Sequence, residues 1–302
     1  MDTADKPKYV LITPAKNEEA FIERTIVSII AQTVKPEKWI IVDDGSSDLT
    51  SEIVSSYLPS HTFIQLLKMP QCLTRDFRRK VAAFNAGLEQ LNDIAYSFIG
   101  NLDADISVAP DYYANMIAGL EREPRLGIAG GIIHTRIGNC FMSGDTTSDS
   151  VGGCVQLFRK ECFEEIGGYM PLRDGGEDAA AEIMARMHGW SVRKVPHNNV
   201  YEHRRTGTAV NNVLRARYKD GIRFHSLGYG TIFYLSRCAY RMRDRPPVIG
   251  SLLSLLGFAS AKLHGYPIRL PMPAVSYLRS EQRGKLRQTV LRLIRGLPAL
   301  LD

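Results

Sequence analysis

The chain has 302 residues, 44% of them hydrophobic and 23% charged, a composition that is ordinary for a globular protein with one large core or a main domain and an extension. The net charge of +6 hides an asymmetry, because 18 Lys and Arg residues face only four acids from Arg204 onward, which makes that third +14 and leaves −8 for the rest. A basic region suits nucleic acid, anionic lipid or phosphorylated substrates, but nothing here resembles a nucleic-acid-binding module, so we expect no nucleic-acid partner.

The first hundred residues alternate short apolar runs with stretches of helical periodicity. The apolar runs predict strands at 9–13, 38–42, 62–67 and 96–102. Helices are expected between them, from about 18 to 32, up to about 57, and over 78–91. This alternation predicts an α/β fold with a Rossmann-like, mostly parallel sheet and helices on both faces.

After residue 105 the alternation loosens. The sequence predicts a helix over 110–122, a strand over 126–133, a polar loop over 138–150 and a strand over 152–158. Helices are expected over 160–166 and from 174 to 188, followed by a strand over 192–195. From residue 207 the sequence is helical, basic and aromatic, so we expect one α/β domain over 1–206 and a helical, basic extension over 207–302.

Pairs of acids follow two of the expected strands. Asp103 and Asp105 stand one residue apart where the strand 96–102 ends, and Asp43 and Asp44 follow the strand 38–42. Close carboxylates repel each other unless a cation or water screens them, so the first pair indicates a divalent ion held by oxygen ligands. The ends of parallel strands share the rim where such folds bind nucleotides. The simpler alternative is a turn and a helix N-cap at each place.

Three motifs in this order resemble the nucleotide-sugar motifs of family 2 glycosyltransferases with a GT-A fold. They are PAKNEE at 14–19, WIIVDDGSSD at 39–48 and LDAD at 102–105. The resemblance continues through LFRK at 157–160, IGGY at 166–169 and GED at 176–178, and it covers roughly residues 9–203. Each motif alone is weak, whereas their order and spacing together are specific.

The resemblance implies transfer of a hexosyl or N-acetylhexosaminyl group from a nucleoside diphosphate sugar, UDP by default, to an acceptor hydroxyl, with inversion at the anomeric carbon. It implies that the donor lies against residues of the first three motifs and of the helix 78–91. These residues are Pro14, Ala15, Asn17, Glu18, Asp43, Asp44, Lys80, Asn85, Asp103 and Ala104. For Lys80 a solvated helix face is the alternative.

The resemblance also implies the catalytic roles. Asp178 would deprotonate the acceptor hydroxyl, and Glu177 would position the acceptor or Asp178 itself; a favourable charge at a helix N-terminus is the alternative for both. Asp105 would coordinate Mn²⁺ or Mg²⁺, with Asp103 and His203 as further candidate ligands. A neutral imidazole suits Mn²⁺ better than Mg²⁺, although a lone histidine is more often structural.

The remaining features concern the acceptor and the location of the protein. The chain has no Gln-x-x-Arg-Trp sequence of the kind found in processive members, so we expect one sugar per encounter. The segment 248–261 is apolar, follows several arginines and is too short to span a bilayer, so it either lies on an anionic membrane surface or packs as a buried helix.

The cysteines and the first eight residues favour a cytoplasmic location. The five cysteines have no Cys-x-x-Cys spacing, which argues against a disulfide framework, and the polar residues 1–8 predict no signal peptide. We therefore expect a cytoplasmic protein, peripheral on the inner face of the plasma membrane, that acts on a saccharide or lipid-linked acceptor in cell-surface polysaccharide synthesis.

Two other functions are compatible with parts of this pattern. The first is a catalytically silent nucleotide-sugar-binding or scaffolding subunit, although such a subunit has no chemical need for both Asp105 and Asp178. The second is a sugar-phosphate nucleotidyltransferase, which would have a Gly-rich, Arg-containing loop after the first strand in place of PAKN at 14–17.

Overall fold

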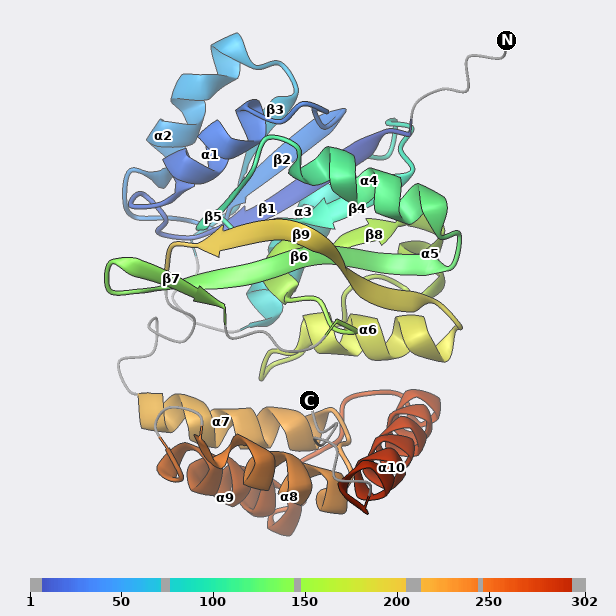
Figure 1. Cartoon of the computed structure of the whole chain (residues 1–302). Coiled ribbons are helices and arrows are strands. Elements are labelled where there is room, and N and C mark those ends of the chain that lie inside the picture. Colours follow the sequence, from blue (N-terminus) through green and yellow to red (C-terminus); the bar gives the residue numbers. More distant parts are fainter. Residues whose placement is uncertain (1–6, 72–76, 144–147, 205–212, 244–246, 295–302) are drawn as a thin grey trace. The chain divides into compact units, whose positions relative to one another are not determined.

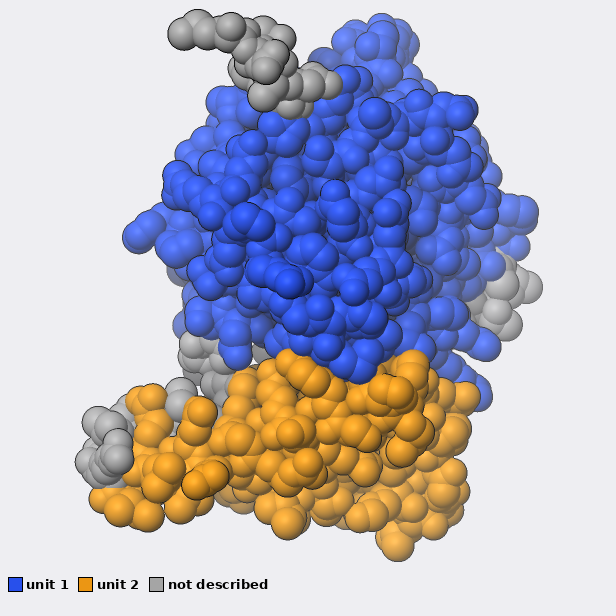
Figure 2. Space-filling view, turned by 90° about the vertical axis from the view of Figure 1, so that its right-hand side faces the viewer, with its two compact units in different colours: residues 1–173, 177–205 blue, residues 174–176, 206–302 orange. Residues whose placement is uncertain are grey.

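The structure is a computed structural model that describes residues 7–71, 77–143, 148–204, 213–243 and 247–294. The chain divides into two compact units, which Figures 1 and 2 show. The first unit consists of residues 1–173 and 177–205, and the second of residues 174–176 and 206–302. The division of function between 1–206 and 207–302 stays a prediction.

The first unit is built on a nine-stranded sheet in the order β3-β2-β1-β4-β8-β6-β9-β5, with β7 paired to β6. The strands are β1 (Tyr9–Ala15), β2 (Lys38–Asp43), β3 (Ile64–Lys68), β4 (Phe98–Asn101), β5 (Ile106–Val108), β6 (Leu126–Ile137), β7 (Cys140–Ser143), β8 (Leu157–Arg159) and β9 (Ser191–Glu202). The helices are α1 (Ile22–Ile30), α2 (Thr50–Tyr57), α3 (Arg78–Glu89), α4 (Tyr112–Arg122), α5 (Lys160–Glu165) and α6 (Glu177–Met187).

The expected parallel sheet forms the first half of this unit. β1 pairs in parallel with both β2 and β4, and β2 pairs in parallel with β3. The second half is mixed, because β8 pairs antiparallel with β4 and β6, whereas β6 and β9 run parallel and side by side (Figure 1). The fold class is therefore α/β as expected, and the acids that follow β2 and β4 lie at the same edge of the sheet.

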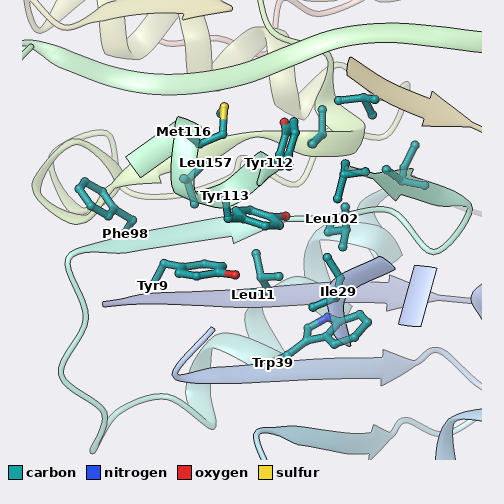
Figure 3. Close-up of a cluster of buried hydrophobic side chains, with 14 of the residues drawn as sticks. Tyr9, Leu11, Ile29, Trp39, Phe98, Leu102, Tyr112, Tyr113, Met116 and Leu157 are labelled. Atoms are coloured by element: carbon teal, nitrogen blue, oxygen red, sulfur yellow. The ribbon is translucent and has the colours of Figure 1, made fainter. Parts of the chain in front are cut away.

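Alternation along the central strands explains why helices cover both faces. In β1, Tyr9 and Leu11 face one hydrophobic cluster, and Val10 and Ile12 face the other. The first cluster is closed by apolar residues of α1, α2 and α4, and the second by those of α3, α5 and α6. Figure 3 shows the first cluster, where the ring of Tyr9 stacks on that of Tyr113 with centroids 4.7 Å apart. Burial on both faces fixes the register of a parallel strand, which holds the strand ends in place.

Several sequence expectations for the second half were wrong in detail. The expected polar loop 138–150 contains β7, and β5 was not expected. The expected strand 152–158 is shortened to β8, because residues 153–155 form a 3₁₀ turn. The last strand is longer than 192–195, since a register shift lets β9 continue: Gly130 pairs with Lys194 but Ile132 pairs with Asn199.

The second unit is helical, as the sequence predicted for the region after residue 207. Its helices are α7 (Val213–Ser226), α8 (Thr231–Tyr240), α9 (Ile249–Leu263) and α10 (Met272–Ile294). The aromatic rings of Tyr234 on α8 and Phe258 on α9 stack with centroids 4.4 Å apart, and the Tyr234 hydroxyl lies 2.6 Å from Ser254 Oγ. Within the described ranges, no helix has the length and apolar content that crossing a membrane would require.

Candidate functional site

The loops that follow β1 and β2 are locked together by hydrogen bonds. The backbone N–H of Asn17 donates to Ser46 Oγ at 2.9 Å, and Asn17 Oδ1 accepts from the backbone N–H of Ser47 at 2.9 Å. The backbone N–H of Glu18 donates to Thr50 Oγ1 at 2.8 Å. Asn17 has a φ of 56°, a value that asparagine tolerates better than most residues. The structure thus brings the first two predicted donor-binding motifs together.

Asp43 and Asp44 are adjacent but have different surroundings. The Asp43 carboxylate accepts from the backbone N–H of Ser46 at 2.8 Å and from the hydroxyl of Ser51, so it holds the turn before α2. Asp44 forms a bidentate salt bridge with the guanidinium of Arg79 on α3, in which Nε donates to Oδ2 at 3.0 Å and Nη2 donates to Oδ1. Asp44 therefore joins the sheet edge to α3.

Lys80 links two acidic motifs that are far apart in the sequence. Its Nζ lies 2.8 Å from Oδ1 of Asp103 and 3.9 Å from Oε1 of Glu177. Asp103 also accepts from Nδ2 of Asn101 at 3.2 Å. Although burial lowers the pKa of Lys80, the charges of Asp103 and Glu177 outweigh that effect and raise it above the usual value. Lys80 is therefore a cation that faces the site, and the alternative of a solvated helix face is wrong.

Glu177 and Asp178 form the first turn of α6. Burial raises the pKa of Glu177, Lys80 opposes that shift, and Asp178 adds to it. Asp178 and Glu177 line one pocket with residues of α3, β4 and the 3₁₀ turn at 153–155; the other lining residues are Lys80, Val81, Phe84, Asn101, Gly153 and Tyr169. The Asp178 carboxylate accepts no hydrogen bond from any described residue, which leaves it available to a bound hydroxyl group.

The backbone at Gly153 passes directly over Asp178. A Cβ atom at position 153 would lie 2.6 Å from Oδ2 and 2.7 Å from Cβ of Asp178, too close for any real contact. The carbonyl oxygen of Gly153 also accepts from Nδ2 of Asn101 at 2.5 Å, which fixes the backbone there. Glycine is required at this position because the turn approaches the carboxylate so closely.

We therefore expect Gly153→Ala to displace the Asp178 side chain. If Asp178 is the base, turnover should fall by at least tenfold, since small misplacements of a catalytic group are costly. Nucleoside diphosphate release and calorimetric donor binding measure the two effects separately. The matched control is Gly284→Ala on α10, because a Cβ there meets nothing within 4 Å and, as at Gly153, the φ of the residue is not positive. An unchanged turnover in Gly153→Ala would contradict the role given to this contact.

Asp105 lies beside Asp103 at the end of β4 and carries a strongly shifted pKa. Burial raises the pKa of Asp105 to about 7, and the charges of Asp103 and Glu202 add to that shift. Such a carboxyl resists ionisation until a cation compensates its charge, so Asp103 and Asp105 suit a divalent ion chemically. Among the described residues no group of three His, Cys, Asp or Glu side chains could hold a metal alone.

Glu18 faces the same acids from the loop after β1. Burial raises the pKa of Glu18 to about 8; Arg204 opposes this shift, and Asp105 and Asp103 add to it. An Nη2 of Arg204 lies 2.5 Å from Oε2 of Glu18, and the guanidinium stacks over the ring of Phe21 at 5.1 Å. Arg204 is thus a cation beside the acidic group that the sequence did not single out, although it directly follows His203.

His203 lies close to Asp105 through the backbone, since its N–H donates to the Asp105 carbonyl at 2.9 Å. Its ring nitrogens have other neighbours: Nε2 lies 2.8 Å from Ser107 Oγ, and Nδ1 lies 3.4 Å from Arg24. Burial and the charges of Arg24 and Arg136 lower the pKa of His203, which keeps the ring neutral as a metal ligand requires. Its role on a metal stays a prediction.

Four of the predicted donor-binding residues contribute less than the others to the cluster of polar and charged side chains described above. The side chains of Ala15 and Ala104 are buried in the core, and the Ala104 carbonyl already accepts from Thr25. Pro14 is half-buried in β1, and Asn85 is exposed on α3 and does not line the pocket. Conversely, the sequence did not single out Arg79 or Asn101, whose only sequence signal was their place beside Lys80 and the LDAD motif.

Comparison with known proteins identifies the family. A family model described as Glycosyl transferase family 2 matches residues 10–167, which is more than half of the chain. The match includes the candidate site residues from Asn17 to Asp105. The chain belongs to glycosyl transferase family 2. The poly-beta-1,6-N-acetyl-D-glucosamine synthase of Staphylococcus aureus (strain COL) is 25% identical to it over 199 residues, 60% of this chain and 46% of that protein. The chain thus spans about half the length of the curated relatives it matches.

Solved structures show the same fold for this family 2 chain. The mannosyltransferase PcManGT of Pyrobaculum calidifontis, in complex with GDP-Man and Mn²⁺, superposes with a TM-score of 0.56 at 18% identity, covering 94% of this chain and 82% of its own. S. aureus TarS 1–349, in complex with UDP-GlcNAc, gives a TM-score of 0.52 at 13% identity over 85% of this chain and 92% of its own. The fold is therefore the GT-A fold that the sequence motifs predicted.

Proposed function

We propose that this protein transfers one sugar from a nucleoside diphosphate sugar to an acceptor hydroxyl with inversion. The observation that carries the proposal is the Lys80 bridge, which joins Asp103 at the end of β4 to Glu177 at the start of α6. Lys80 and the unengaged Asp178 line one pocket, and Lys80 pairs with the carboxylate of Asp103 beside it. Family membership and the GT-A fold support the same reaction class.

The chain's own residues account for the chemical step in this proposal. Asp178 accepts the proton of the acceptor hydroxyl as its oxygen forms a bond to the anomeric carbon. The bond from that carbon to the diphosphate oxygen breaks on the opposite face, and the nucleoside diphosphate leaves with the electron pair. Lys80 supplies a positive charge next to Asp103 and Glu177 throughout, which stabilises negative charge in the pocket.

A divalent cation completes the donor site in the proposal. Asp105 would hold it, with Asp103 as a second carboxylate and His203 as a candidate third ligand. The raised pKa of Asp105 supports this assignment, because the buried carboxyl lacks a compensating positive charge. When bound, Mn²⁺ or Mg²⁺ would neutralise the charge on the leaving diphosphate.

The acceptor in the proposal is a saccharide, free or carried on a lipid at the inner face of the plasma membrane. Support comes from the relatives, which are named as synthases of a polysaccharide, and from the basic second unit. The lack of a Gln-x-x-Arg-Trp sequence supports transfer of a single sugar per encounter.

A panel of nucleotide sugars tests the proposal directly. The purified full chain is given UDP- and GDP-linked sugars with Mn²⁺ or Mg²⁺, with and without saccharide and lipid-linked acceptors, and released nucleoside diphosphate is measured. We expect release with one donor, greater in the presence of an acceptor and lost in EDTA. Donor binding without release under every condition, with the same binding in Asp178→Asn, would instead support a catalytically silent subunit.

A further inference from the structure

Helix α9 of the second unit packs on α7 through its smallest residues. A Cβ atom at Gly257 would lie 2.0 Å from the carbonyl oxygen of Tyr218, and one at Gly221 would lie 2.0 Å from the carbonyl oxygen of Ser254. The two backbones therefore touch, and the contact leaves no space for large side chains. Ser254, Gly257 and Ala261, which follow at helical spacing, are all buried on this side of α9.

Four large apolar residues of α9 lie on the opposite side, whereas Phe258 is buried on the packed side. Ile249, Leu252, Leu256 and Leu263 recur at helical spacing and are exposed by 54%, 48%, 59% and 84%. A helix of a water-soluble bundle has the reverse arrangement, with leucines inside and polar residues outside. The helix is therefore buried on one side, where Phe258 packs beside the small residues, and it exposes these four large apolar residues on the other.

Helix α8 continues the same kind of surface. Ile232 is exposed by 72% and Leu235 by 50%, while Phe233 and Tyr234 are buried. Lys262 Nζ donates to Thr231 Oγ1 at 2.9 Å, which brings the start of α8 beside the end of α9 and thus Ile232 to the same end of the pair as Leu263. We call Ile232, Leu235, Ile249, Leu252, Leu256 and Leu263 the α8–α9 apolar face.

Charge identifies the partner that fits the α8–α9 apolar face. Residues 206–302 contain 16 Lys and Arg residues against four acids, and Arg237 and Lys262 lie on the same two helices as the face. A second copy of this chain would bring a unit of the same sign against it, which is unfavourable. Anionic lipid supplies both an apolar layer for the leucines and negative charge for the cations.

We propose that the α8–α9 apolar face docks the protein in the plane of an anionic bilayer, with α9 lying in the interface. A helix of 15 residues is about 22 Å long, shorter than the roughly 30 Å hydrocarbon core, so α9 lies along the surface and does not cross it. The proposal specifies the surface for the membrane location proposed above, and it is independent of the catalytic residues.

Vesicle binding of the full chain tests the docking face. The wild type should sediment with phosphatidylcholine vesicles that contain phosphatidylglycerol at low salt, and much less with phosphatidylcholine alone or at high salt. Leu252→Gln combined with Leu256→Gln should weaken binding at least tenfold, because two large apolar side chains no longer enter the interface. Val27→Gln is the matched control, since Val27 is exposed by 52% on α1 of the first unit and should bind as the wild type.

A second variant reports the depth of insertion. Leu256→Trp should show a blue shift of its fluorescence on adding anionic vesicles, because the indole would move into the acyl boundary. The docking proposal is overturned if the wild type does not bind these vesicles or if the double variant binds them as tightly as the wild type. It is also overturned if the wild type self-associates without lipid and the double variant does not. Release of nucleoside diphosphate with a soluble acceptor should be the same in all these variants, so a failed docking test and a failed transferase proposal are distinguishable.

Discussion

Replacing Asp178 by Asn is expected to lower kcat for sugar transfer by about 10²- to 10⁴-fold while leaving donor affinity unchanged. The amide has the shape of the carboxylate but accepts no proton from the acceptor. Asp178 accepts no hydrogen bond from the described residues, so the substitution removes a proton acceptor and breaks no structural contact. Nucleoside diphosphate release gives kcat, and calorimetric titration of the nucleoside diphosphate gives the donor affinity.

Asp93→Asn is the matched control, because Asp93 is an exposed acid that belongs to none of the motifs of the site and does not line the pocket. It should have the kcat of the wild type. A kcat for Asp178→Asn within a few-fold of the wild type would exclude Asp178 as the base. Glu177→Gln then becomes the informative variant, since Glu177 is the other acid at the start of α6 and lies 3.9 Å from Lys80.

The sequence predicted the parallel half of the fold and the positions of its acids because that information is local. β1 and β2 are buried on both faces and therefore read as continuous apolar runs, and polar turn residues mark their ends. Asp43 and Asp44 stand at the end of the β2 run, and Asp103 and Asp105 follow the buried run of β4, so their place at one edge of the sheet followed from the topology alone.

In the mixed half the sequence predicted β6, β8, β9 and the helices but not the strand pairing, the full length of β9, or β5 and β7, because these depend on partners that lie far away in the chain. β9 runs through Pro196 and His197, which interrupt any apolar pattern, and it remains a strand only because β6 accommodates it with a register shift. β7 is exposed along its whole length and thus carries no burial signal. For the same reason the contact of Gly153 with Asp178 was invisible in the sequence, since only packing brings the 3₁₀ turn against α6.

The Lys80 bridge is the largest feature of the site that sequence alone could not supply. Residues 80, 103 and 177 come from a helix, a strand end and another helix, and the salt bridges among them depend on side-chain geometry. The sequence offered Lys80 either as a donor contact or as a solvated residue. In the structure Lys80 instead pairs with two acids, Asp103 of the predicted donor site and Glu177 of the predicted catalytic pair.

Asp105→Asn is expected to abolish the metal dependence of donor binding. In the proposal Asp105 binds the cation that meets the diphosphate, an interaction worth several kcal/mol, so affinity for the nucleoside diphosphate in Mn²⁺ should fall by about 10²-fold or more. Calorimetric titration with Mn²⁺ and with EDTA measures the effect without any need for turnover. The wild type should bind tightly only with Mn²⁺, and the variant should bind weakly in both.

Thermal unfolding separates this loss from a failure to fold. The pKa of Asp105 is raised to about 7 in the folded protein, so its ionisation destabilises the metal-free fold as the pH rises from the unfolded value toward 7. The Asn variant carries no such cost, and at pH 8 without metal its Tm should equal or exceed that of the wild type. Mn²⁺ with nucleoside diphosphate should raise the Tm of the wild type and of the Asp93→Asn control but not that of Asp105→Asn. An equal rise in all three proteins would contradict metal ligation by Asp105. It would show that the variant still binds Mn²⁺ without the carboxylate that is proposed to hold the ion.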